Sequence, residues 1–515
     1  MNRVTKWLGG VWAPLLIAFA WLVATAWMRP LALPDEGRYV GVAWEMLRSG
    51  NWLVPTLDGL PYFHKPPLFY WLTALALPLV DASRIAARVA PLAGAFLASG
   101  SLYFFARRWA GVVTARIVLA MVATSPLFFF GAQYANLDML VAGCITAAVL
   151  AFAHAALVGD QAVGRRRILL CGYVACALGV LAKGLIGIVL PGMVLVLWLA
   201  IERHWVAMWR LVWWPGIAAF LVIAAPWFLL MQQQFSGFGH YFFIVQHFER
   251  FSGATFNNAQ PAWFYIAVLA LLMLPWSLWF ARVHKLEWRN GDAEVSTRRL
   301  MAVWALSITF FFSLPHSKLV GYIFPAVAPV AYLLAGAARD ACARSARWMK
   351  ALRASFAIAI VLCVGAATGF SIKADRSQAD IGHALRDRVA SGDTVVMLDE
   401  YRFAIPFEAR LRAPVVVVSD WSPAAVASRD NWRKELADAA LFEPRADWLV
   451  GASEIPARLC TARSAWIVAG EDASQRHPWL RDLPQVAHSG RLVLSRLEDA
   501  SAVKSALCRG TPSAH

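Results

Sequence analysis

Charged residues are scarce in this sequence: aspartate, glutamate, lysine and arginine make up only 16% of its 515 residues. Soluble globular proteins carry about 25% charged and about 45–50% apolar residues. This chain is 59% hydrophobic, with a mean hydropathy of +0.54. That is too much apolar surface for one buried core. The composition therefore excludes an ordinary soluble protein and predicts a polytopic membrane protein.

Several chemical motifs are also missing. The seven cysteines include no CxxC pair, the histidines show no HxxxH or HExxH spacing, and no nucleic-acid-binding motif accompanies the net charge of +16. The positive charges lie in short loops between apolar runs, which is the positive-inside pattern of membrane proteins. Cys460 and Cys508 lie in the polar C-terminal part, and whether they pair depends on an oxidising environment.

The first 371 residues contain twelve apolar runs. The first run follows the basic start MNRVTK and is interpreted as an uncleaved span, because no small-residue cleavage site follows it cleanly. The runs lie near residues 12–28, 66–80, 88–106, 117–134, 138–158, 168–182, 185–201, 213–231, 263–281, 300–314, 320–337 and 352–371.

The basic loops decide how many of these runs cross the membrane. If all twelve crossed from a cytoplasmic N-terminus, every basic loop would lie outside, against the positive-inside rule. Removing one early span places all of them inside. The loops in question are 106–116, 164–167, 203–210, 282–299 and 339–350.

The run at 66–80 is the best candidate for removal, because it is the shortest of the early runs and opens with two prolines. We expect a helix that lies along the outer membrane surface, with Phe69, Tyr70 and Trp71 at headgroup level. About eleven transmembrane helices remain. This topology leaves Arg84 and Arg88 on the outer side, which counts against it.

The character of the chain changes near residue 372. Short apolar runs of strand length (TVVMLD, PVVVVSD, ADWLVG, AWIVAG and RLVLSRL) alternate there with helical stretches such as DIGHALRDRVA. This pattern predicts a soluble α/β domain over residues 372–515. By the same topology, that domain and two loops of the 1–371 membrane domain, at 29–88 and 232–262, face outwards. In a bacterium that side is the periplasm.

Three acids stand near the outer membrane boundary. Asp35 and Glu36 follow the first span between Pro34 and Gly37, and Asp138 stands between two later runs. Ionisable groups at membrane depth are costly and usually functional, so Asp35 and Asp138 are the predicted catalytic pair. The alternatives are a solvated loop acid, above all for Glu36, and a helix N-cap for Asp138.

Cations occur on the same predicted side, although basic residues otherwise concentrate inside. Lysines also extend to membrane interfaces without any function. Several on one face argue for an anionic ligand such as a lipid phosphate. The predicted substrate-binding residues are Glu36, Arg38, Tyr39, Lys65, Lys183, Arg250, Lys318 and Tyr322.

Two histidines complete the predicted site. His64 precedes Lys65 in the segment HKPP, and His247 lies in the segment HFERF. Together with a carboxylate they could hold a divalent metal. Since their spacing matches no metal motif, the sequence leaves the metal open.

These segments together resemble a known family. In order they are DEGRY, SGNW, PYFHKPPLFYW, LDM, AKGLIGIVLPG, HFERF and SKLVGYIFP. They are similar to the lipid A aminoarabinose transferases, within the wider dolichyl-phosphate-mannose-like protein mannosyltransferases. The resemblance covers roughly residues 10–340.

The resemblance implies a GT-C glycosyltransferase of the bacterial inner membrane. Such enzymes take a sugar from undecaprenyl phosphate on the periplasmic face, and this branch passes it to a lipid A phosphate. By position, Asp35 and Asp138 are the family's two acids. The cationic groups of Lys65, Arg38 and Lys183, together with Lys318 and Tyr322, would hold the lipid phosphate.

One position departs from the family, which commonly has glutamate before Lys-Pro-Pro where this chain has His64. That glutamate and the histidine of the HFERF-like segment have been associated with a metal. With His64 and His247 in these places, the softer ligand set would favour zinc over magnesium.

Two other functions compete with this interpretation. A related transferase with a protein or glycan acceptor would share the lipid-facing site and differ only in its acceptor groove. A transporter or flippase would show internal repeats and charges at the middle of its spans, and neither is visible in the sequence. The identity of the sugar also stays open.

Overall fold

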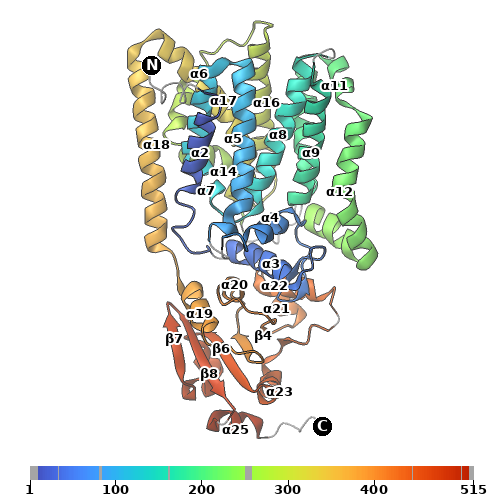
Figure 1. Cartoon of the computed structure of the whole chain (residues 1–515), viewed down its shortest axis with the longest axis vertical. Helices are drawn as coiled ribbons and strands as arrows, with labels where there is room; N and C mark the ends of the chain where they lie inside the picture. Colours follow the sequence, from blue (N-terminus) through green and yellow to red (C-terminus); the bar gives the residue numbers. More distant parts are fainter. Residues whose placement is uncertain are drawn as a thin grey trace.

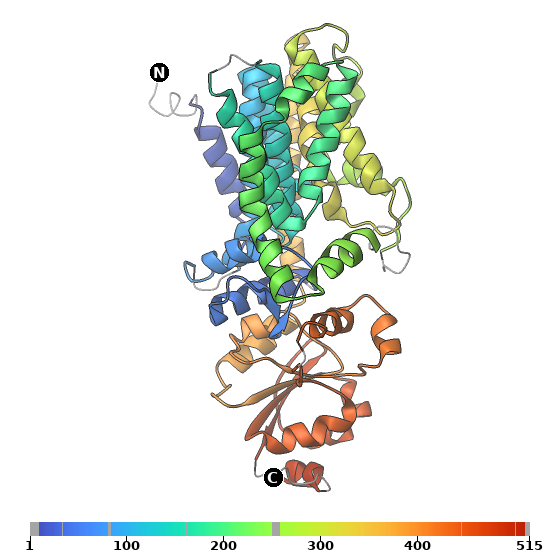
Figure 2. The ribbon, with the colours of Figure 1, turned by 90° about the vertical axis from the view of Figure 1, so that its right-hand side faces the viewer.

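A computed structural model describes residues 10–32, 34–80, 84–159, 163–249, 258–443, 445–499 and 501–509, with the backbone alone for 247–249. The molecule is elongated, with a helical part at one end and a sheet-containing domain at the other (Figures 1 and 2). The principal helices of the helical part are α2 (Ala13–Val23), α5 (Val89–Trp109), α6 (Gly111–Thr124), α7 (Pro126–Ala132), α8 (Leu137–Leu157), α9 (Arg165–Lys183), α10 (Ile186–Ile201), α11 (Trp205–Leu211), α12 (Trp214–Gln234), α14 (Phe264–Leu272), α15 (Phe280–Val283), α16 (Ala293–Ser313), α17 (Phe324–Arg344) and α18 (Ala346–Lys373).

Each apolar run of the sequence forms a helix or a bent pair of helices. Within the described residues, five helical stretches are long and apolar enough to cross a membrane, and two bent pairs raise the number to seven. The chain is thus a multi-span membrane protein, whereas the count of about eleven spans stays a prediction. The five stretches are Ala86–Trp109, Leu137–Leu157, Trp214–Gln234, Val320–Arg344 and Ala346–Lys373, and the pairs are α6 with α7 and α14 with Trp276–Val283.

The basic loops gather at one end of the helical part, which we call the basic end. Their ion pairs and hydrogen bonds connect all five, so the positive-inside argument from the sequence agrees with the fold. Helix α18 starts at this end and leads to the opposite end, where the C-terminal domain follows (Figure 1). The connecting contacts are Arg339 to the Ala110 carbonyl and to Glu294, Arg299 to Glu202, and Arg165 to the Arg210 carbonyl.

The opposite end, called the domain end below, is covered by the folded loop that follows the first span. It forms α3 (Asp35–Ser49), the hairpin of β1 (Thr56–Leu57) and β2 (Leu60–Pro61), α4 (Leu68–Ala76) and η1 (Ala86–Arg88). Asp58 and Gly59 connect the two strands with φ angles of 53° and 76°. A two-residue turn with both φ angles positive suits Asp-Gly and matches the twist of the strands.

Helix α4 is the short helix expected at 66–80. Its nine residues reach about 14 Å, so it cannot cross a hydrocarbon core of about 30 Å. It lies with α3 between the helical bundle and the C-terminal domain (Figure 1). The expectation that Phe69 and Tyr70 anchor this helix in the headgroups is wrong, because both are fully buried and pack near Tyr39 of α3.

The C-terminal domain follows α18 and contains one six-stranded sheet in the order β5-β4-β3-β6-β8-β7. The first four of these strands are parallel to one another. Strand β8 runs antiparallel to both of its neighbours, β6 and β7. This confirms the predicted α/β character. The strands are β3 (Thr394–Leu398), β4 (Val416–Val418), β5 (Leu449–Val450), β6 (Ser464–Gly470), β7 (Gln485–Ser489) and β8 (Leu492–Glu498), and the helices are α19 (Ser377–Arg386), α20 (Ile405–Glu408), α21 (Pro423–Ala427), α22 (Trp432–Ala440), α23 (Ile455–Thr461), α24 (Ala473–Arg476) and α25 (Ala502–Cys508).

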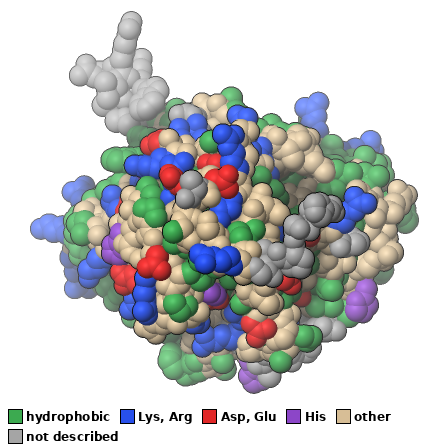
Figure 3. Space-filling view, turned by 90° about the horizontal axis from the view of Figure 1, so that it is seen from below, with side chains coloured by type: hydrophobic (Ala, Val, Ile, Leu, Met, Phe, Trp, Pro, Cys, Tyr) green, Lys and Arg blue, Asp and Glu red, His purple; other side chains and the backbone are tan. Residues whose placement is uncertain are grey.

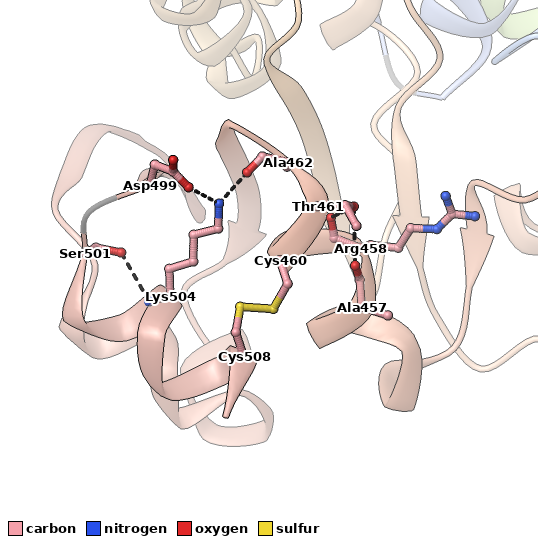
Figure 4. The surroundings of a disulfide bond; sticks show 9 residues. All are labelled: Ala457, Arg458, Cys460, Thr461, Ala462, Asp499, Ser501, Lys504 and Cys508. Carbon is pink, nitrogen blue, oxygen red and sulfur yellow. Dashed lines mark hydrogen bonds and ion pairs between the residues drawn. A yellow bond between two sulfur atoms is a disulfide. The ribbon is translucent and has the colours of Figure 1, made fainter. Parts of the chain in front are cut away.

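A disulfide fastens the last helix to this domain. Cys460 in α23 is bonded to Cys508 in α25, with 5.7 Å between their Cα atoms (Figure 4). Beside it, Lys504 donates to the Ala462 carbonyl and pairs with Asp499 at 2.5 Å. The face of the domain that points away from the helices mixes acidic and basic side chains among uncharged ones, as expected of a water-exposed surface (Figure 3).

Candidate active site

The domain end holds both predicted catalytic acids. Asp35 begins α3, and Asp138 lies in the first turn of α8. The alternative reading of Asp138 as the helix N-cap is wrong, since Asn136 is the cap and its Oδ1 accepts from the Asp138 backbone N–H at 2.9 Å. The Asp138 side chain is therefore available for tertiary contacts.

Glu36, by contrast, is a structural residue. Its carboxylate is completely buried and pairs with Arg29 and Arg88. It also accepts from the backbone N–H groups of Ala32 and Ala135, at 2.6 and 2.7 Å. Burial alone would raise its pKa, but the charges and hydrogen bonds of Arg88 and Arg29 lower the pKa of Glu36 to about 2. Neither a solvated loop acid nor a substrate ligand fits this position.

Arg88 is explained by the same cluster. The sequence placed this arginine on the outer side, against the positive-inside rule. In the structure it is fully buried, and its Nε donates to Glu36 Oε1 at 3.1 Å. Its charge is thus compensated inside the protein, so it does not bear on the orientation.

Asp35 belongs to a different ion-pair group. Its Oδ1 accepts from an Arg38 Nη at 2.5 Å, one helical turn along α3. The other Nη of Arg38 pairs with Glu435 of α22, in the C-terminal domain. The Arg38 guanidinium also lies 4.7 Å from the ring centre of Tyr39, whose hydroxyl accepts from it at 3.2 Å. Burial opposes the charge of Arg38, but the carboxylate of Glu435, and less strongly that of Asp35, raises the pKa of Arg38.

Asp138 forms a third group with two of the predicted binding residues. The Lys183 ammonium at the end of α9 pairs with Asp138 and lies 4.4 Å from the ring centre of Tyr322. Both side chains of the ion pair are largely buried. Gly321 allows this close approach, because a Cβ there would lie only 2.2 Å from Asp138 Oδ2. An acid, a cation and a phenol from three separate helical elements therefore meet here.

The loop between α7 and α8 connects these groups. Ala135 donates its backbone N–H to Glu36, and Asp138 follows three residues later. The neighbouring Tyr134 was not predicted from the sequence. Burial, then the negative charges of Asp35 and Glu36, raise the pKa of Tyr134. The two predicted acids thus share one region at the end of the bundle.

The remaining predicted cations have different surroundings. Lys318 is buried, and its ammonium donates to the carbonyls of Gln260 and Pro315, at 2.9 and 2.5 Å. It therefore fastens the segment before α17 to the segment before α14. Lys65 is half-buried in the turn before α4. Arg250 lies outside the described residues.

His64 lies against the C-terminal domain. Its ring stacks on Tyr62 at 4.6 Å, and its Nε2 is 4.0 Å from Asp438 of α22. The side chain of His247 lies outside the described part of the chain. Among the described side chains, no three histidine, cysteine or acidic residues come close enough to hold a metal. His64 and Asp438 supply two donors, fewer than the three or four that zinc takes, so metal binding stays a prediction.

The contribution of the C-terminal domain to this region was not predicted from the sequence. Helix α22 carries Glu435 and Asp438 three residues apart, and Glu435 pairs with Arg38 while Asp438 lies near His64. Asp438 accepts a hydrogen bond from Tyr241 at 3.2 Å. The Asn431 cap and the i, i+3 spacing of the acids predict an amphipathic helix, but nothing in the sequence shows which surface it meets.

Comparison with known proteins supports the fold and the resemblance. The sequence model described as dolichyl-phosphate-mannose-protein mannosyltransferase matches residues 64–229. An undecaprenyl phosphate-alpha-4-amino-4-deoxy-L-arabinose arabinosyl transferase from Shewanella sediminis is 32% identical over 343 residues, which are 65% of this chain and 61% of that protein. One from Sodalis glossinidius is 33% identical over 345 residues, covering 66% and 60%. The chain spans about three-fifths of the length of these curated relatives.

Solved structures agree with this result. The crystal structure of ArnT from Cupriavidus metallidurans bound to undecaprenyl phosphate matches with a TM-score of 0.82 and 23% identity, over 96% of this chain and 99% of that one. The archaeal oligosaccharyltransferase AglB from Archaeoglobus fulgidus matches with a TM-score of 0.53 and 16% identity, over 92% and 71%. These matches confirm the predicted GT-C fold with its C-terminal domain.

Proposed function

We propose that this chain, a homologue of the undecaprenyl-phosphate-aminoarabinose transferases that shares their fold, transfers an amino sugar from undecaprenyl phosphate to a phosphate of lipid A. The observation that carries the proposal is the meeting of Asp138, Lys183 and Tyr322 next to the region of Asp35. A phosphate-linked amino sugar carries an anionic phosphate and a cationic ammonium. This region offers a lysine for the phosphate and carboxylates for the ammonium.

We place the site on the periplasmic face of a bacterial inner membrane. The five basic loops lie at the other end of the bundle, which the positive-inside rule assigns to the cytoplasm. The disulfide between Cys460 and Cys508 supports the same orientation, because such bonds persist in oxidising compartments such as the periplasm.

The reaction exchanges one phosphate for another at the anomeric carbon of the sugar. The bond between that carbon and the undecaprenyl phosphate oxygen breaks, and its electron pair stays on the phosphate. A lipid A phosphate oxygen forms the new bond. Since this acceptor is already ionised at neutral pH, no general base has to remove a proton. Positive charge near the leaving phosphate lowers the barrier, and we assign that task to Lys183.

The acids then have an orienting role. Asp35 and Asp138 would pair with the ammonium of the sugar and favour the positive charge that develops at the anomeric carbon in the transition state. With a hydroxyl acceptor, one of them would have to serve as a base. The acceptor therefore determines the role of the acids. Zinc on His64 and His247 remains part of the proposal without any step assigned to it.

Mass spectrometry of lipid A, from cells with and without this gene, tests the function. We expect a mass increase of one amino sugar per modified phosphate in cells that express the chain. An unchanged lipid A spectrum would reject this acceptor and favour a protein or glycan. Asp35→Asn should abolish the transfer in a folded protein, whereas Asp482→Asn, on the exposed surface of the C-terminal domain, is the matched control. Metal analysis of the same preparations decides whether zinc is bound.

A further inference from the structure

Asp35 is held by one nitrogen of a single arginine, Arg38, and each N–H-bearing nitrogen of the guanidinium is called an arm below. The only hydrogen bond that its carboxylate accepts within the described residues is the one from Arg38 to Oδ1, at 2.5 Å. The side chain of Asp35 keeps 26% of its surface exposed. Its Oδ2 is thus accessible for a substrate group.

Arg38 is shared between two acids from different parts of the chain. One Nη binds Asp35 and the other binds Glu435, a residue 397 positions away in the sequence. Its Nε makes no hydrogen bond to any described residue. An arginine beside a single carboxylate commonly forms two parallel hydrogen bonds to it. Nε could complete such a pair, but Glu435 holds the opposite Nη and so fixes the guanidinium in an orientation in which Nε does not bind Asp35.

Glu435 is held firmly enough to fix the orientation of the Arg38 guanidinium. It lies in the first turn of α22, where the helix dipole favours a negative charge, and its backbone N–H donates to the carbonyl of Asn431. The hydroxyl of Tyr62 lies 3.4 Å from its second carboxylate oxygen. The side chain is largely buried, so its orientation is fixed by contacts on both sides.

The C-terminal domain is docked closely enough to keep this geometry. Gly37 of α3 lies so near to Ala404 that a Cβ there would be 2.8 Å from the Ala404 backbone nitrogen. On the neighbouring hairpin, Asp58 accepts from the Val415 backbone N–H at 2.8 Å. Both contacts hold the C-terminal domain against α3 and the hairpin, and α22 itself packs against β2 of that hairpin (Figure 1).

We propose that Glu435 is a positioning residue of the transfer site: it limits Arg38 to a one-armed contact with Asp35 and so leaves Asp35 Oδ2 for the substrate. The C-terminal domain thereby contributes to the chemistry of the membrane part. This inference rests on the proposed function, because it takes Asp35 to be the acid that contacts the sugar.

The test compares sugar transfer by the purified full-length chain and its variants. In Glu435→Ala, Arg38 is expected to turn both arms to Asp35 and occupy the oxygen that the substrate needs. We expect kcat to fall about tenfold or more, the size of losing one charge-assisted hydrogen bond in the transition state, with a smaller change in KM. Glu454→Ala, an exposed acid of the same domain, should keep the wild-type rate.

A second variant separates positioning from general damage. If Glu435 acts through Arg38, then adding Glu435→Ala to Arg38→Met should cause no further loss of rate. Losses that multiply in the double variant would overturn the proposal, and so would a wild-type kcat in Glu435→Ala.

A crystal structure of Glu435→Ala decides the inference independently of activity. A two-armed pair between Arg38 and Asp35 would support it, whereas an unchanged one-armed contact would overturn it. Should the wild-type chain leave lipid A unmodified, the proposed function fails, while this structure still tests the geometry.

Discussion

Replacing Glu36 by glutamine tests how much the buried ion pairs of Glu36 with Arg29 and Arg88 stabilise the protein. Two arginines and two backbone N–H groups converge on this fully buried carboxylate. Its pKa is lowered from 4.5 to about 2. Each pKa unit corresponds to about 1.4 kcal/mol, so the ionised form contributes about 3 kcal/mol to the free energy of unfolding.

The pH dependence of this contribution has a definite sign. Because the pKa is lower in the folded protein, the stabilisation is complete above the unfolded value of 4.5 and is lost as the pH falls towards 2. Glutamine cannot ionise. The stability difference between wild type and Glu36→Gln should therefore be largest near neutral pH and shrink through this window.

Tryptophan fluorescence during heating of the detergent-solubilised protein measures this difference. At pH 7 we expect Glu36→Gln to unfold several degrees below wild type, because Arg29 and Arg88 are left close together without their anion. Glu454→Gln serves as the control that changes an exposed acid. Equal unfolding temperatures at pH 7, or a difference that stays constant down to pH 3, would refute the reasoning.

Two further predictions concern a close contact and the disulfide. Gly321→Ala places a Cβ 2.2 Å from Asp138 Oδ2, so it should abolish sugar transfer in a folded protein, whereas Gly365→Ala, with open space around it, should not; full activity of the first variant would contradict the described pairing. Removing the bond between Cys460 and Cys508, which are 48 residues apart, should lower the unfolding free energy of the C-terminal domain by about 4 kcal/mol. A reductant should then lower the unfolding temperature of wild type but not of Cys460→Ser, and an equal response of both would reject this role.

The helices of the apolar runs and most strands of the C-terminal sheet could be predicted because each depends on a local pattern, whereas α3, in a segment interpreted as a loop, was not predicted. Long apolar runs and short β-branched runs mark buried helices and strands whatever their partners. The strand Gln485–Ser489 was missed because it lies at the edge of the sheet, is only partly buried and lacks a continuous apolar run. The proposed orientation rests on loop charges, which also act locally.

The roles of the acids could not be predicted, because they depend on tertiary contacts. Asp35 and Glu36 are neighbours in the sequence, yet successive residues point about 100° apart around a helix. One side chain therefore meets two buried arginines, and the other remains accessible beside Arg38. Glu435 is more remote still, since 397 residues separate it from its partner. No local pattern carries that information.

The ion pairs of Arg38 and Lys183 decide which of these two cations suits a phosphate ligand better. The resemblance assigned Arg38 and Lys183 to the same task. Arg38 is one cation held by two carboxylates, so this group already carries an excess of negative charge, which opposes an incoming phosphate. Lys183 pairs with the carboxylate of Asp138, and its ammonium carries the charge and the kind of N–H donor that bind a phosphate. We infer that Lys183 holds the leaving phosphate, while Arg38 orients Asp35.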